Sequence, residues 1–128
     1  MQTSDTANIP RISGKITVDD SQYLGRWKGI LKLNNNLQSE VQFLIDKSQD
    51  GLATGIVEKS LTTGVGGHVL ECANARVSLE SRGNDKVLIS FNGPKCEGSN
   101  VVSIEADKLN GRVKFGIGYR TLSFKKSS

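Results

Sequence analysis

Short apolar segments that alternate with polar residues recur along this chain. Val41, Phe43 and Ile45 alternate with Glu40, Gln42 and Asp46, broken only by Leu44, and later segments repeat the alternation. Because successive side chains of a strand point to opposite faces, this period of two predicts strands with one buried face. We predict such strands at residues 27–33, 41–46, 52–58, 75–80, 86–91, 101–105, 112–115 and 119–124.

Turn residues separate these segments. The dipeptides Asp50-Gly51 and Asn110-Gly111 are typical of two-residue hairpin turns, the second joining a segment near Leu109 to residues 112–115. Further turns are predicted at 34–36 and 82–85, and a loop at 61–67. No amphipathic helix and no long crossover interrupts the segments. The pattern therefore predicts an all-β fold, an antiparallel up-and-down barrel of about eight strands, with a two-sheet β-sandwich as the alternative.

The domain organisation follows from length and from the polar N-terminus. A chain of 128 residues suffices for one domain. Residues 1–21 are mostly polar and contain Pro10, so we predict a flexible N-terminal arm followed by a single β-barrel domain over 22–128. Within the arm, the alternation at 14–18 indicates a short strand or a segment that folds on a partner. The apolar runs are too short to span a membrane, and no secretory signal precedes the barrel.

The opening of the predicted barrel, Gly25-Arg26-Trp27, resembles the Gly-x-Trp start of the calycin-type barrels, which include lipocalins, avidins and small bacterial protease inhibitors. The resemblance implies a lipocalin-like or avidin-like barrel in which Trp27 is a structural anchor closing one end. Trp27 is the sole tryptophan, whereas avidins build their ligand pocket with several. Biotin binding is therefore not expected.

Two cysteines bear on the cellular compartment. Cys72 and Cys96 are an even count in a small, glycine-rich β domain, which favours a disulfide and a secreted or periplasmic location. Two free thiols in a cytoplasmic protein are the alternative. The net charge of +4 comes from dispersed basic residues and only weakly indicates acidic partners.

The candidate chemistry is sparse. His68 is the sole histidine, and neither Cys-x-x-Cys nor paired histidines accompany it, so we expect no metal and no cofactor. A disulfide would also remove the thiol that His68 could activate, so no catalytic residues are predicted and the protein is expected not to be an enzyme. The glycine-rich loop lacks the Lys and Ser/Thr of a phosphate-binding loop. Loops at barrel mouths often bind partners, and the binding candidates are Thr62, Thr63, Gly64, Gly66, Gly67 and His68.

The remaining function classes are binding functions. Nucleic-acid binding is not expected, because Phe43, Phe91, Phe115 and Phe124 fall on the apolar phase of their strands and leave few aromatics for stacking on bases. We expect a non-enzymatic, exported binding module, as an enzyme inhibitor or protein-interaction barrel. The alternative is a lipocalin-like carrier of a small apolar ligand.

Overall fold

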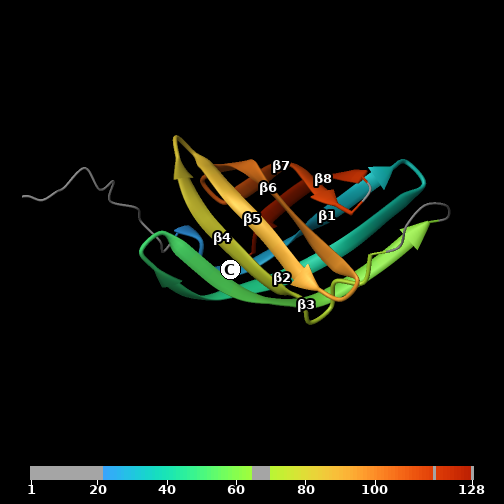
Figure 1. Ribbon diagram of the computed structural model, residues 1–128, viewed down its shortest axis with the longest axis horizontal. Helices are drawn as coiled ribbons and strands as arrows, with labels where there is room; N and C mark the ends of the chain where they lie inside the picture. The colour runs from blue at the N-terminus through green and yellow to red at the C-terminus, as the bar shows by residue number, and fades with distance from the viewer. Residues whose placement is uncertain (1–21, 65–69, 117, 128) are drawn as a thin grey trace, which may run out of the picture.

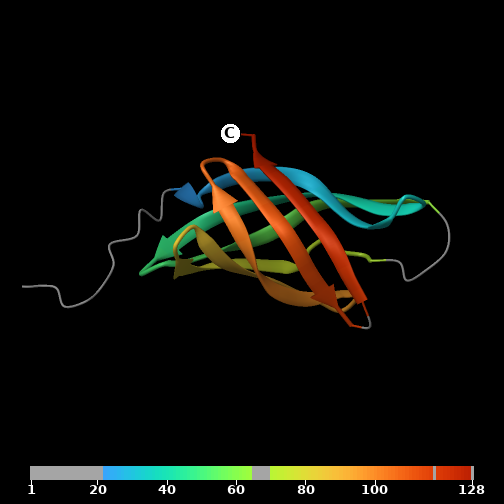
Figure 2. The same cartoon turned by 90° about the horizontal axis from the view of Figure 1, so that it is seen from above.

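The computed structural model describes residues 22–64, 70–116 and 118–127. The predicted arm, including the strand at 14–18, lies outside these residues. The described residues form eight antiparallel strands (Figures 1 and 2), namely β1 (Gly25–Asn34), β2 (Leu37–Gln49), β3 (Leu52–Gly64), β4 (Arg76–Gly83), β5 (Lys86–Gly93), β6 (Cys96–Glu105), β7 (Lys108–Phe115) and β8 (Gly118–Lys126).

The strands follow one another around a closed barrel. Each strand pairs with its sequence neighbours, and β1 pairs with β8 from Trp27 opposite Lys126 to Lys32 opposite Thr121, which closes the sheet. The prediction of an up-and-down barrel is confirmed, and the β-sandwich is excluded. No helix in the described part of the chain is long and apolar enough to cross a membrane.

Two hairpin turns form at pairs of residues that adopt a positive φ at low cost. Asp50 and Gly51 have φ values of 54° and 83° between β2 and β3, and Asn84 and Asp85 have 51° and 60° between β4 and β5. Turns of this hand match the twist of the strands they join, and Asn, Asp and Gly adopt them at low cost. Both turns lie where the sequence predicts them.

The prediction of a hairpin turn at Asn110-Gly111 is wrong. β7 runs straight through this dipeptide, with Asn110 opposite Ser103 of β6 and Ser123 of β8. The alternation continues on both sides, since Leu109 and Val113 are fully buried, and burying both outweighs the turn preference. The glycine instead allows close packing, because a Cβ at Gly111 would lie 2.7 Å from a Val102 methyl group. The chain turns earlier, at Ala106 and Asp107.

The predicted loop at 61–67 begins later than expected, because β3 continues to Gly64. Leu61 pairs with Glu40 and Gly64 pairs with Leu37 of β2. The strand β2 is long enough to pair with β3 up to Gly64. The sequence does not predict this extension, because residues 62–64 lack aliphatic alternation. The long β2–β3 pair reaches past the ends of β4 and β5 (Figures 1 and 2).

Aromatic rings fill the centre of the barrel. The Phe43 ring on β2 lies 6.3 Å from Trp27, 5.1 Å from Phe124 and 6.1 Å from Phe91, centroid to centroid. β2 and β5 are three strands apart, so the contact between Phe43 and Phe91 spans the interior. Phe91 continues the cluster to Phe115 at 5.7 Å. An eight-stranded barrel is just wide enough for side chains to fill.

Aliphatic side chains complete this core. Leu31, Val57, Leu79, Ile89 and Leu109 all have no exposed surface. A cavity able to hold a ligand would leave accessible area on the side chains that line it. The interior bounded by these residues is therefore packed.

Candidate functional site

A disulfide lies at the end of the barrel where β3 ends and β6 begins. Cys72, in the segment before β4, is bonded to Cys96, the first residue of β6, with both residues buried and their Cα atoms 4.9 Å apart. The predicted disulfide is thus present in the structure. An isolated bridge between Glu71 and Lys95 reinforces the same junction.

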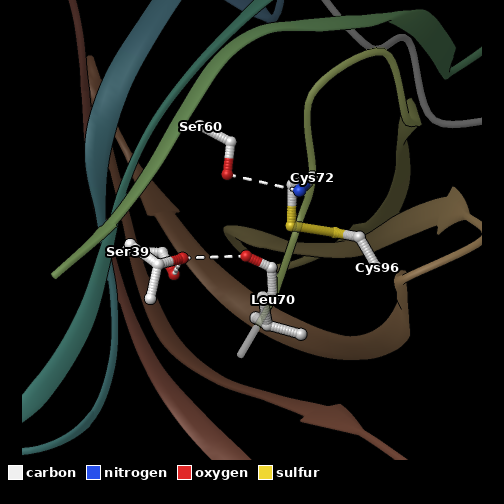
Figure 3. The surroundings of a disulfide bond; sticks show 6 residues. Ser39, Ser60, Leu70, Cys72 and Cys96 are labelled. Carbon is white, nitrogen blue, oxygen red and sulfur yellow. Dashed lines mark hydrogen bonds between the residues drawn. A yellow bond between two sulfur atoms is a disulfide. The ribbon is translucent and has the colours of Figure 1, made fainter. Parts of the chain in front are cut away.

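Serine and threonine hydroxyls connect this segment to the β2–β3 pair (Figure 3). The Thr62 hydroxyl donates to the Leu70 carbonyl oxygen at 2.8 Å, so the Ser39 hydroxyl donates to Thr62 at 2.8 Å. The Ser60 hydroxyl accepts a hydrogen bond from the backbone N–H of Cys72 at 3.2 Å. Ser39 is fully buried, so the chain of hydroxyls supplies the partner that a buried polar group needs.

The predicted contact residues have different environments. Thr62 is half-buried and its hydroxyl is committed to Ser39 and Leu70. Thr63 and Gly64 are exposed at the end of β3. Gly66, Gly67 and His68 lie outside the described residues. Of the three described candidates, Thr62 therefore bonds within the fold, whereas Thr63 is exposed.

Beside this end, the outer face of β1, β2 and β3 carries a depression of about 520 Å³. Its apolar lining comes from Ile30, from the buried Val41 and from Leu61, a residue that is 61% exposed. Lys28, Lys59 and Glu40 surround these residues. The depression thus combines an aliphatic floor with charges of both signs.

A β-bulge in β3 organises the polar groups next to this depression. Gln42 pairs with Lys59 and Phe43 with Val57, which leaves Glu58 as the extra residue. The Glu58 carboxylate accepts hydrogen bonds from Arg26 Nε at 2.9 Å, Arg26 Nη2 at 3.2 Å and Gln42 Nε2 at 2.8 Å. Hydrogen bonding from Arg26, and then from Gln42, lowers the pKa of Glu58, and the same bond raises the pKa of Arg26.

A second depression, of about 600 Å³, crosses the outer face of β2 to β5. Thr54 of β3 pairs with Ser78 of β4, which pairs with Ser90 of β5, so three small hydroxyl side chains form its floor. Ile56 and Arg76 lie in the next row along the strands.

One charged side chain points into the barrel. Arg120 is 3% exposed and shares the inward phase of β8 with Leu122 and Phe124. Burial lowers the pKa of its guanidinium. Arg120 and Ser39 are the buried polar residues of the described core.

The described side chains do not assemble a metal site, since no three His, Cys, Asp or Glu residues of the described ranges come together. The disulfide leaves no free thiol on either cysteine. The described groups around the two depressions can form hydrogen bonds, ion pairs and apolar contacts.

Sequence reasoning missed Glu58, Ser39, Ser60 and Arg120. Ser39 and Arg120 interrupt apolar alternation on the inward phase of β2 and β8, so each carried a signal for a buried polar group. Glu58 had no such signal, because the bulge that presents it depends on the register between β2 and β3.

Comparisons with known proteins give one structural likeness. The sequence matches no protein-family model and no curated protein. The structure is similar to a Schistosoma mansoni fatty acid binding protein in complex with arachidonic acid, with 19% sequence identity and a TM-score of 0.44. The match covers 87% of this chain and 100% of that chain.

Proposed function

We propose that this chain is a non-enzymatic binding module that meets its partner with the outer face and the disulfide end of its barrel. The aromatic cluster around Phe43 carries this proposal, because its rings occupy the space in which a barrel would otherwise enclose a ligand. The exposed Leu61 and the adjacent depression support contact from outside. An inhibitor or protein-interaction barrel is the concrete form of this function.

We also propose a secreted or periplasmic location for this protein. The Cys72–Cys96 bond supports an oxidising environment, because disulfides persist in secreted and periplasmic proteins and are rare in the cytosol. Alkylation of protein from its own host, in denaturant and without reductant, tests this location. We expect no labelled thiol, and two labelled thiols would contradict an exported protein.

A carrier of a small apolar ligand is the second candidate. Apart from Ser39 and Arg120, the buried residues of the described part of the chain are hydrophobic, and barrels of eight strands include ones that hold a single small ligand. Entry of such a ligand would require the rings of the Phe43 cluster to move apart.

Native mass spectrometry of protein purified from its own host separates the two candidates. The outer-face proposal predicts the mass of the polypeptide alone, with its disulfide. A stoichiometric small molecule that survives gentle ionisation and is lost on denaturation would replace it with the carrier function.

The inhibitor form has its own test. Inhibition of a panel of secreted hydrolases is compared between the full chain, a variant lacking residues 1–21, and Thr63→Arg on the exposed end of β3. Thr63→Arg leaves the buried hydroxyl chain through Thr62 intact, so a loss of inhibition would place the contact at this end. Inhibition unchanged by both variants would contradict a role for the arm and for the disulfide end.

A further inference from the structure

We propose that two copies of this chain associate through the free edge of β3, in antiparallel register about a two-fold axis at Leu61. Leu61 also lines the depression proposed above for partner contact, so the two proposals share this residue, and self-association is tested without any partner.

Among the described residues, the second half of β3 has no neighbouring strand on one side. β3 pairs with β4 from Leu52 to Ile56, where β4 begins, whereas its pairing with β2 continues to Gly64. Residues 70–75 approach this half, but among the described residues the backbone contacts end at Val57, which bonds Asn74 and Ala75. Beyond Val57, the hydroxyls of Ser60 and Thr62 form hydrogen bonds with that segment.

The bulge determines which backbone groups face the free edge. Val57 directs its N–H and C=O away from β2, toward Ala75 and Asn74. The extra residue Glu58 shifts the alternation of backbone directions by one residue. Beyond it, the backbone groups of Lys59, Leu61 and Thr63 face β2. The N–H and C=O groups of Ser60 and Thr62 face the free edge. An exposed row of such groups is a template for pairing with another strand.

A second copy of the same edge complements this row. Pairing about Leu61 sets Ser60 opposite the other copy's Thr62, with their N–H and C=O groups facing, and Leu61 opposite Leu61 as a non-hydrogen-bonded pair. Lys59 then lies opposite Thr63, so no like charges face each other on the outer face. Leu61 is the most exposed large hydrophobic residue described, and this arrangement buries it against its copy.

The expected association is concentration-dependent, because an edge of about five residues, 59–63, buries less area than the roughly 1,000 Å² of a stable interface. Sedimentation velocity from micromolar to millimolar concentration should show a rapid monomer–dimer equilibrium. Leu61→Lys, which sets two like charges on the axis, should remain monomeric. Leu52→Lys is the matched control, since Leu52 is an exposed leucine of the paired half of β3, and it should dimerise as the unmodified chain does.

A cysteine variant tests the register. Non-hydrogen-bonded pairs place Cα atoms about 4.5 Å apart, within the range that a disulfide bridges. Leu61→Cys should therefore form a cross-linked dimer on oxidation, with peptide mapping showing Cys72–Cys96 intact, and Leu52→Cys should not. An unmodified chain that stays monomeric at all concentrations would overturn the proposal. Equal association of Leu61→Lys and Leu52→Lys would overturn it too, as would equal cross-linking of Leu61→Cys and Leu52→Cys.

Discussion

The two ends of the barrel are closed by different physical means. At one end the Trp27 ring is fully buried, lies nearly parallel to the Phe43 ring and donates its indole N–H to the Tyr23 carbonyl oxygen at 2.9 Å. At the other end a disulfide and serine and threonine hydroxyls join residues 70–75 to the sheet. Packing with the rest of the core closes the first end, whereas the second depends on a few specific bonds.

The two ends also differ in what lies beneath their exposed side chains. The Trp27 end exposes Leu24 and Leu52 beside a depression of about 780 Å³. The disulfide end leaves Leu61 and Thr63 exposed on the β2–β3 pair, while the bonds beneath them fix the adjoining segment. A rigid support under exposed side chains is a common arrangement for a binding site.

Trp27→Ala should have the largest effect on stability. Removing a large buried aromatic side chain costs about 3–5 kcal/mol. Denaturant unfolding should show this loss in the free energy of unfolding, whereas Lys28→Ala on the outer face should change it by less than about 0.5 kcal/mol. Similar losses for both variants would contradict the packing described for this end.

Removing the disulfide should come next. Cys72 and Cys96 are 24 residues apart, and a bond closing a loop of this size stabilises by about 3 kcal/mol. Cys72→Ala with Cys96→Ala should lower the unfolding free energy by about this amount. Hydrogen exchange should accelerate in residues 70–75 and remain slow around Trp27. Equal acceleration in both regions would contradict the claim that the disulfide stabilises one end more than the other.

Thr62→Val should be less damaging but specific. The substitution keeps the shape of the side chain and removes the hydroxyl that joins Ser39 to Leu70, which leaves buried polar groups short of a partner. The expected cost is about 1–3 kcal/mol. Thr63→Val is the control, because Thr63 is exposed, and an equal effect of the two substitutions would refute the role of the hydroxyl chain.

The ion pair on the outer face should have the smallest effect. Because the pKa of Glu58 is lowered in the folded protein, its stabilising contribution is present above the ordinary carboxyl pKa and is lost as pH falls through the lowered value. The difference in melting temperature between the unmodified chain and Glu58→Gln should be small at neutral pH, smaller in high salt and absent in acid. A difference in melting temperature that grows as the pH falls would contradict a lowered pKa of Glu58.

The sequence was sufficient for the architecture because strand alternation and turn chemistry are local. Asp50-Gly51 lies at a turn as predicted, and Asn110-Gly111 does not, because burial of Leu109 and Val113 on one continuous strand is a tertiary effect. Pairing of Cys72 with Cys96 was predictable since these are the two cysteines of the chain.

The site was less predictable, because its geometry depends on register. The bulge at Glu58 and the extension of β3 to Gly64 arise from pairing with β2, which no local pattern reports. For the same reason no local pattern predicts that pairing of β3 with β4 stops at Ile56, opposite Arg76.

The central claim is that side chains fill the barrel, and Trp27 fluorescence tests it most directly. Trp27 is the sole tryptophan and contacts the ring at the centre of the core, so a ligand entering the interior would change its emission. Titration with oleate, a long-chain apolar probe, should leave the emission spectrum unchanged. A saturable change at one oleate per chain would contradict a filled interior and establish the barrel as a carrier.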